Sequence, residues 1–302
     1  MDLSVDIAGL KLNNPVIAAA GTFGYSDEYG QLINISRLGA VTTKGLSVEP
    51  WEGNPYPRVA ETASGLINSV GLQNKGVRAF IDEDLPLLGA LDSKVIVNIA
   101  GKTVDEYGEV ASIIDRYESA DAVEINISCP NVKKGGLTFG SDPDIAAKVV
   151  AAVKKKTSKV VIVKLSPNVT DVAEIAKKVV AAGADALSLI NTVLAMAIDH
   201  RTKKPKLANV YGGLSGPAIK PIALRMVHQV SQAVDVPIIG MGGISNLEDA
   251  LEFLIAGANA LAVGTATFSN PQTMLEIVDG LQDYLEKNKI SLDDLSGSLE
   301  SG

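Results

Sequence analysis

The chain has 302 residues, of which 46% are hydrophobic and 21% are charged, and its formal net charge is −8. That length can bury a large core, either as one domain or as two small ones. The acidic balance argues against a general binder of nucleic-acid phosphates, and charges interrupt every apolar run, so we expect no membrane-spanning segment.

Short runs of β-branched or small apolar residues recur along the chain, separated by segments of helical periodicity. The predicted strands are, in chain order, residues 16–19, 40–43, 95–99, 122–126, 160–164, 186–190, 237–240 and 260–263. Amphipathic helices are predicted between them, and those at 171–182 and 247–256 each end in Gly-Ala, where glycine suits a helix C-cap. Strands that alternate with helices indicate a parallel sheet.

Eight such units predict an α/β fold, a single (β/α)8 TIM barrel over residues 1–302, since this barrel typically takes roughly 250 residues plus insertions. A doubly wound open sheet is the alternative, but its G-x-G-x-x-G signature directly after the first strand is missing. We find no linker, no low-complexity region and no second domain. Residues 296–302 are expected to form a frayed tail.

Three connections are too long for simple turns, at residues 45–94, 129–141 and 191–219. Long ordered loops inside a compact domain are usually functional. All three follow the C-terminal ends of predicted strands, the end at which barrels of this kind keep their active sites. We therefore expect long loops over one functional face.

Polar residues or glycines stand at or just past the C-terminal end of each predicted strand, whereas the strand interiors read as apolar. These rim positions are Ala20-Gly21, Lys44, Asn98, Asn126, Lys164, Asn191-Thr192, Gly242-Gly243 and Gly264-Thr265. Buried charges and amides need partners, and a ligand with carbonyls and anionic groups supplies them. The sequence predicts that at least four of these positions line one site.

The glycine pairs after the seventh and eighth strands fit a phosphate-binding site. In these barrels the last two βα loops, with a short helix N-terminus, commonly hold a phosphate, because glycine lets backbone N–H groups approach its oxygens. Glycines alone would indicate only tight turns. Together with lysines on the same rim they favour a phosphorylated cofactor. The rim asparagines could hydrogen-bond a flat ring system, and a ligand with both a phosphate and such a ring suggests flavin mononucleotide (FMN).

Cys129 is the only cysteine of the chain and follows the predicted strand 122–126. One cysteine and two histidines make neither an internal disulfide nor a Cys/His metal site, so no metal is expected. With no disulfide framework and no secretory signal, we expect a cytoplasmic protein. A free thiol is most often a small buried residue, but the polar neighbours Asn126 and Asn131 and the loop Lys133-Lys134-Gly135-Gly136 favour a chemical role.

Four segments resemble the dihydroorotate dehydrogenases of class 1, the cysteine type. They are Glu52-Gly53-Asn54-Pro55, residues 68–74 (NSVGLQN), residues 126–131 (NISCPN) and residues 212–217 (GGLSGP), and they match in order over nearly the whole chain. Residues 71–74, 133–136 and 209–221 further resemble the catalytic subunit of the NAD-linked subclass 1B. The resemblance implies oxidation of dihydroorotate to orotate in pyrimidine biosynthesis.

The resemblance also implies roles for single residues. Cys129 would be the general base while hydride passes to FMN; a free thiol has a pKa of about 8.5, which Lys133 and Lys134 could lower. The implied substrate contacts are Lys44, Asn68, Ser69, Val70, Gly71, Leu72, Asn126, Asn131, Asn191 and Thr192. The implied FMN contacts are Ala20, Lys44, Gly45, Asn98, Asn126, Lys164, Ile190, Gly216, Gly242, Gly243, Gly264 and Thr265. Many relatives carry serine in place of Ala20, which leaves only a backbone contact there.

Subclass 1B further implies a partner, an iron–sulfur flavoprotein that carries FAD and a [2Fe-2S] cluster and binds NAD. Such a cluster needs about four cysteine thiolates, and this chain has one cysteine. The cluster must therefore sit on another polypeptide, in an assembly of two catalytic and two electron-transfer subunits.

Three other functions are compatible with parts of the pattern. A subclass 1A enzyme would pass electrons to fumarate without a partner. A Schiff-base lyase on a barrel would use Lys164 or Lys44 as its amine. A non-catalytic scaffold barrel is the third, although the thiol and the polar rim residues are all present.

Overall fold

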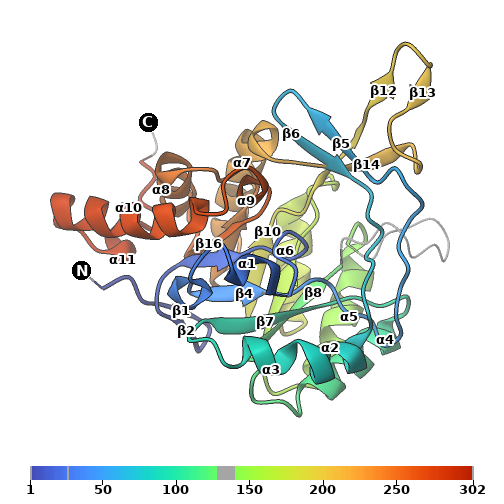
Figure 1. Cartoon of the computed structure of the whole chain (residues 1–302). Helices are drawn as coiled ribbons and strands as arrows, with labels where there is room; N and C mark the ends of the chain where they lie inside the picture. The colour runs from blue at the N-terminus through green and yellow to red at the C-terminus, as the bar shows by residue number, and fades with distance from the viewer. Residues whose placement is uncertain (1, 26, 128–139, 301–302) are drawn as a thin grey trace.

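The computed structural model describes residues 2–25, 27–127 and 140–300. Its centre is a closed barrel of parallel strands, which confirms the predicted TIM barrel (Figure 1). In barrel order the strands are β3 (Val16–Ala18), β4 (Ala40–Thr42), β7 (Lys94–Ile99), β8 (Ala122–Asn126), β9 (Val160–Lys164), β10 (Ala186–Leu189), β15 (Ile238–Met241) and β16 (Ala260–Val263). The pairing of Ala262 on β16 with Ile17 on β3 closes the sheet and rules out the open alternative.

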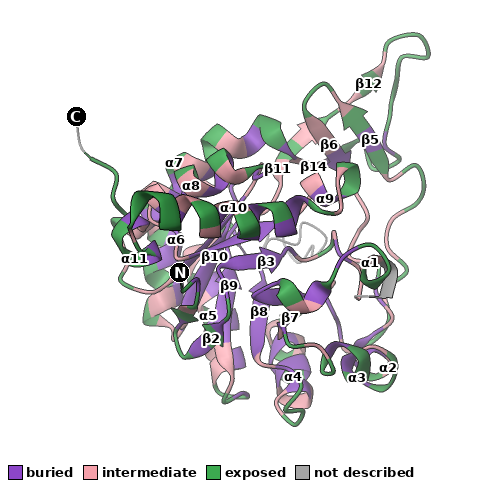
Figure 2. Ribbon diagram, turned by 60° about the vertical axis from the view of Figure 1, so that its left-hand side comes forward, coloured by how far each residue is buried: buried purple, intermediate pink, exposed green. Residues whose placement is uncertain are grey.

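Helices surround the barrel and bury one face each, as Figure 2 shows for α4 and α10. The longer ones are α4 (Val104–Ile114), α5 (Pro143–Lys154), α6 (Val172–Ala181), α7 (Lys220–Ser231), α8 (Leu247–Ile255) and α10 (Thr273–Asn288). The shorter ones are α1 (Asp27–Gly30), α2 (Val77–Glu83), α3 (Leu85–Leu88), α9 (Ala266–Ser269), α11 (Leu292–Leu295) and the 3-10 turns η1 (Ile35–Arg37) and η2 (Pro217–Ile219). Side-chain caps start several of them, since Thr103, Asp171 and Asn246 each accept from a backbone N–H of the first turn.

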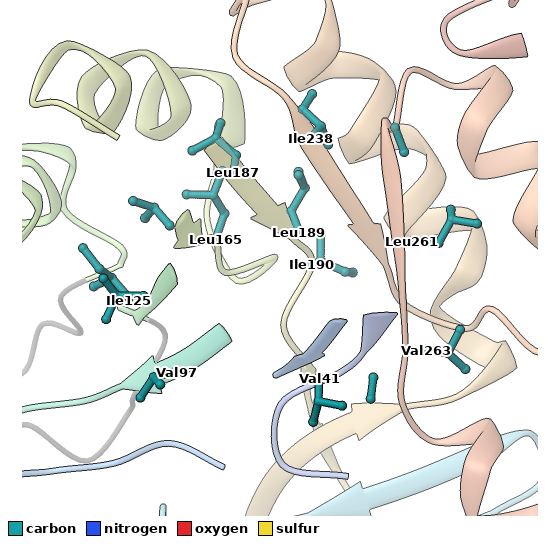
Figure 3. Close-up of a cluster of buried hydrophobic side chains, with 14 of the residues drawn as sticks. Val41, Val97, Ile125, Leu165, Leu187, Leu189, Ile190, Ile238, Leu261 and Val263 are labelled. Atoms are coloured by element: carbon teal, nitrogen blue, oxygen red, sulfur yellow. The ribbon is translucent and has the colours of Figure 1, made fainter. Parts of the chain in front are cut away.

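Two apolar layers hold the barrel together. The outer layer lies between strands and helices, and Figure 3 shows Val41, Val97, Leu187 and Val263 from four different strands of it. The inner layer fills the interior of the barrel near the amino ends of its strands with small and branched residues. It includes side chains of an N-terminal hairpin, β1 (Val5–Ile7) and β2 (Leu10–Leu12), which covers the amino end of the barrel. Ligands therefore have to meet the barrel at its other end.

The expectation that the strand interiors are apolar is wrong at one level of the barrel. Glu124 in the middle of β8 is 3% exposed, and it accepts hydrogen bonds from Asn98 of β7 at 2.5 Å and from Ser188 of β10 at 2.7 Å. A buried carboxylate is tolerated where hydrogen-bond donors satisfy it. This polar layer separates the apolar floor of the barrel from its rim.

The two longest insertions form a second sheet and are not irregular loops. Four antiparallel strands make it up, in the order β11 (Val193–Met196), β14 (Tyr211–Ser215), β6 (Gly65–Asn68) and β5 (Val59–Thr62). A small hairpin, β12 (Ile198–Asp199) and β13 (Lys204–Pro205), extends beyond it. Figure 1 shows β5, β6, β14 and this hairpin projecting from one side of the barrel.

Part of the expected frayed tail, residues 296–299, is hydrogen-bonded to the chain around the end of α8, and residues 301–302 lie outside the described residues. The backbone N–H of Gly297 donates to the carbonyl of Leu254 at 2.9 Å, and that of Leu299 donates to the carbonyl of Ile255 at 3.2 Å. Both acceptors lie at the end of α8, so residues 296–299 pack against that helix. Within residues 2–25, 27–127 and 140–300, no helix is both long enough and apolar enough to cross a bilayer.

Candidate active site

A cavity of about 730 Å³ opens at the C-terminal ends of the barrel strands. It lies between β3, β9, β10, β15 and β16 on one side and the turn between β5 and β6 on the other. The structure brings eight of the twelve predicted FMN contacts to its wall: Ala20, Lys164, Ile190, Gly216, Gly242, Gly243, Gly264 and Thr265. Asn191 and Thr192, two of the predicted substrate contacts, also line it.

One end of this cavity is a backbone cradle. Gly216, Gly242 and Gly243 all have positive φ, at 96°, 123° and 86°. A Cβ on Gly243 would lie 2.9 Å from the carbonyl oxygen of Gly216, and a Cβ on Gly216 would lie 2.8 Å from the Cα of Gly65. Only glycine fits such close approaches of backbone to backbone. The cradle therefore presents peptide groups, and not side chains, to a ligand.

Two hydroxyls stand beside the cradle. The Thr265 hydroxyl donates to the Ser215 hydroxyl at 2.7 Å, and both residues line the cavity. Ser215 ends β14, whereas Thr265 directly precedes α9. The second sheet and the barrel thus meet at this wall of the cavity.

A lysine and an asparagine lie at the deep end of the rim. Lys164 ends β9 and Asn126 ends β8, and the two are paired in the barrel register. Their exposed fractions are only 5% and 8%. Asn126 accepts from the Asn191 amide at 3.4 Å, and the Asn191 side-chain oxygen in turn accepts from the backbone N–H of Thr192 at 2.8 Å. These contacts link three strand ends into one polar group.

Asn126 is also held from behind by a residue that the sequence analysis missed. Tyr107 of α4 is fully buried, and its hydroxyl donates to the Asn126 carbonyl at 2.8 Å. This bond fixes the end of β8 immediately before the segment that carries Cys129. A tyrosine in the buried stripe of an amphipathic helix gives no sequence signal beyond ordinary packing.

The predicted substrate contacts of residues 68–72 lie over the rim, on the chain that leaves β6. Asn54 holds them, because its side-chain amide donates to the Ser69 carbonyl and its backbone N–H to the Val70 carbonyl, each at 3.0 Å. Gly71 has a φ of 77°, and a Cβ there would fall 2.6 Å from the Asn54 side chain. Leu72 is left-handed as well, with a φ of 53°, a strain that tends to accompany function.

This segment meets the barrel at the predicted contact Gly45, which directly follows Lys44. A Cβ on Gly45 would lie 3.5 Å from the Leu72 side chain. Asn68 on β6 donates to the Gly213 carbonyl of β14 at 3.4 Å. Among the described residues, neither Lys44, Gly45 nor residues 68–72 line the 730 Å³ cavity, so they form a separate wall beside it.

Asn98 lies lower than the rim position predicted for it. It is 0% exposed, inside β7. Its amide nitrogen donates to Glu124, and its side-chain oxygen has no hydrogen-bond partner among the described residues. Because only the NH₂ group can face a carboxylate, Glu124 fixes which way this amide points. Glu124 could have been noticed as the single charge inside an otherwise apolar strand, Ala122-Val123-Glu124-Ile125.

Two predicted site residues, Cys129 and Asn131, lie outside the described residues, as do Lys133 and Lys134.

The chain is similar to known proteins over nearly its whole length. Residues 2–285 match the family model described as dihydroorotate dehydrogenase. The chain is 57% identical over 300 residues to the "Dihydroorotate dehydrogenase B (NAD(+)), catalytic subunit" of Geotalea daltonii, covering 99% of this chain and 98% of that one. It is 55% identical over 300 residues to the protein of the same name from Alkaliphilus metalliredigens, covering 99% of both chains.

Proposed function

Since the chain belongs to the dihydroorotate dehydrogenase family, we propose that it oxidises dihydroorotate to orotate as the catalytic subunit of an NAD-linked enzyme of subclass 1B. The observation that carries this proposal is a match of 57% identity to such a subunit over 99% of the chain. The cavity at the C-terminal face of the barrel is the place where this fold keeps its chemistry. A lyase that forms a Schiff base on Lys164 is disfavoured by the family match.

Family membership implies a flavin, and we propose that the flavin is FMN. The cavity fits a phosphorylated ligand, since its glycine cradle leaves room for an anion against backbone N–H groups. When bound, FMN supplies the acceptor for the hydride that leaves the substrate. The proposed contacts are Ala20, Lys44, Gly45, Asn98, Asn126, Lys164, Ile190, Gly216, Gly242, Gly243, Gly264 and Thr265.

Within this set, each kind of residue has a distinct task. The peptide groups of the cradle hold the phosphate, and the Thr265 hydroxyl is directly beside them. Lys164 places a positive charge at the barrel end of the cavity, where it favours electron-rich oxygens. Ala20 contributes through its backbone alone.

The substrate is proposed to bind between the cavity and the wall formed by residues 68–72. Its ring alternates carbonyls and N–H groups, which amides and peptide groups can match. The proposed contacts are Lys44, Asn68, Ser69, Val70, Gly71, Leu72, Asn126, Asn131, Asn191 and Thr192. Asn126 and Asn191 belong both to the hydrogen-bonded group at the rim and to this set. They would therefore position the substrate next to the cofactor.

Cys129 is the proposed general base that removes a proton from the substrate ring. In sequence it follows the end of β8 by three positions, next to Asn126 of the polar rim. A thiol with an ordinary pKa of about 8.5 is mostly protonated at neutral pH, so its surroundings have to favour the thiolate.

The relatives are named as catalytic subunits, which implies a partner subunit for this chain too. We propose that the partner is an iron–sulfur flavoprotein with FAD and a [2Fe-2S] cluster, that it binds NAD, and that two copies of each chain assemble. The cysteine count supports this, because one thiol cannot hold a cluster that needs about four.

An anaerobic absorption spectrum, taken before and after addition of dihydroorotate, tests the proposal. A flavin spectrum that bleaches on addition is the expected result. A flavin that stays oxidised would contradict the substrate, and a protein that binds no flavin even after FMN is added back would contradict the cofactor. The purified chain should reduce fumarate poorly; efficient turnover with fumarate would move it to subclass 1A.

A further inference from the structure

A partly buried ion pair lies directly behind the glycine cradle. Asp249, in the first turn of α8, is 6% exposed. It accepts from the Lys220 ammonium at 2.7 Å, from the Ser245 backbone N–H at 2.9 Å and from the Ser245 hydroxyl at 2.6 Å. Glu252, one turn further along α8 and largely exposed, is a second partner of Lys220 at 2.9 Å.

These bonds connect the two loops that form the cradle. Ser245 belongs to the loop after β15, which contains Gly242 and Gly243, and Lys220 begins α7, just past Gly216. A Cβ on Gly243 would lie 3.0 Å from the Lys220 backbone nitrogen and 2.9 Å from its Cβ. The loops therefore touch at their backbones, and Asp249 ties one to the other through side chains.

The charges of this group argue for a geometric role and against an electrostatic one. Lys220, Asp249 and Glu252 together carry one positive and two negative charges, so they offer no net attraction to an anion. Burial alone would raise the pKa of Asp249, but hydrogen bonds from Lys220 and Ser245 outweigh it and hold that pKa below its usual value. The hydrogen bond to Asp249 raises the pKa of Lys220. Both groups are charged at neutral pH, and the charge of Lys220 is neutralised within the pair.

We propose that Asp249 is a positioning residue for the cofactor phosphate: by joining Ser245 to Lys220 it holds the backbone of residues 242–245 against the start of α7, in the shape that can receive a phosphate. Asp249 does not contact the ligand itself. This inference rests on the proposed function, since it presupposes that the cradle holds the phosphate of a flavin.

The test compares two flavins that differ only in the phosphate. Asp249→Asn keeps the size of the side chain and removes its charge, and the flavin-free full-length protein is titrated with FMN and with riboflavin by fluorescence quenching. The FMN dissociation constant should rise at least about tenfold, as expected for loss of a charged hydrogen-bond network, while that of riboflavin changes less than about twofold. Equal weakening of both flavins would reduce Asp249 to a general stabiliser and overturn the proposal.

A matched control is available on the same helix. Glu252→Gln removes a carboxylate from the same lysine without touching Ser245, and should leave both dissociation constants unchanged. Tighter FMN binding in Asp249→Asn would show that the carboxylate acts through its charge, and would also overturn the proposal.

A second variant covers a failure of Asp249→Asn to fold. Ser245→Ala removes the 2.6 Å bond to Asp249 and a 3.5 Å bond from the exposed Asn246 amide. It should shift FMN affinity in the same direction by a smaller factor, about threefold, with riboflavin unaffected. No change in FMN affinity in that variant would contradict the inference. If the unsubstituted protein binds neither flavin, the proposed function fails, whereas loss of the FMN-specific effect alone removes only the role of Asp249.

Discussion

The two walls of the site are built in different ways. The wall that we call the phosphate side consists of residues 216–220, 242–246 and 264–266, in short turns whose backbones touch one another and whose shape depends on positive-φ glycines. We call the other wall the hairpin side, after the hairpin of β5 and β6. It consists of residues 44–45, 54 and 68–72, and it depends on the pairing of β6 with β14, segments that are far apart in the chain. The phosphate side is made by loops at the C-terminal face of the barrel, with Gly216 supplied by the end of the second sheet, whereas the hairpin side is made largely by the insertion after β4. Substitutions should therefore separate cofactor binding from substrate binding.

The largest effect is expected from a change that leaves both walls intact. Cys129→Ser replaces the proposed base by a hydroxyl that is a much weaker base, so the rate of flavin reduction by dihydroorotate at neutral pH should fall by about 10²–10⁴-fold. Stopped-flow absorbance under anaerobic conditions measures that rate. FMN should stay bound and orotate should still perturb its spectrum. An unchanged rate would remove Cys129 from the base role.

Next in size is a change to the phosphate side alone. Gly243→Ala forces a Cβ to within 2.9 Å of the Gly216 carbonyl at a φ of 86°. Strain of this kind costs roughly 1–3 kcal/mol, which corresponds to roughly a 5- to 150-fold loss of FMN affinity. Gly9→Ala is the control, since Gly9 has a similar φ of 93° and nothing within 4 Å of the added Cβ. If both variants lose FMN affinity alike, the cradle has no specific role.

A change to the rim residue Asn191 should weaken substrate binding more than FMN binding. Asn191→Ala removes the amide that bonds Asn126 and the backbone N–H of Thr192. Orotate affinity, measured by titration of the flavin spectrum, should fall about tenfold, because one or two hydrogen bonds are lost, while FMN affinity changes less than about twofold. Asn288→Ala at the exposed C-terminal end of α10 makes the same chemical change far from the site and should alter neither affinity. Loss of FMN affinity without loss of orotate affinity would show that Asn191 serves the cofactor and not the substrate.

The smallest expected effect concerns stability and its dependence on pH. The pKa of Asp249 is lowered, so its contribution is present above the unfolded-state pKa of about 3.9 and is lost as the pH falls through the folded-state value. The pKa of Lys220 is raised, so its contribution is present below about 10.4 and is lost as the pH rises through the folded-state value. Thermal unfolding of the wild type and of Asp249→Asn should differ by about 1–2 kcal/mol from about pH 5 to 9, and less at either extreme. A difference that stays constant at pH 3 would contradict the pairing.

The contrast between the phosphate side and the hairpin side also explains what could be predicted from the sequence. The strands 122–126 and 160–164 were predicted with the bounds that the structure shows, because their β-branched runs end at polar residues. Gly242 and Gly243 of the cradle could be predicted because a short βα turn places them at the rim, whereas Gly216, which follows β14, came from the resemblance alone. Both signals are local in the chain.

The hairpin side carried no such signal. Ile67 of β6 pairs with Leu214 of β14, and nothing near either residue in sequence reveals the other. The segments were predicted only as long loops over the functional face, and the resemblance of residues 68–74 to a known family was what marked single residues within them. Glu124 was missed for a related reason: its partners Asn98 and Ser188 lie on other strands, and only the closed barrel brings the three together.

The β1–β2 hairpin at residues 5–12 closes the amino end of the barrel and leaves only the C-terminal end open. Its side chains and the apolar layer above them fill the amino end, so substrate and product have to use the opposite face. If the proposed partner docks at that face, it shares the surface through which dihydroorotate enters and orotate leaves. The order in which substrate binds, product leaves and the partner docks then becomes a kinetic property of the assembly, because the β1–β2 hairpin closes the other end of the barrel.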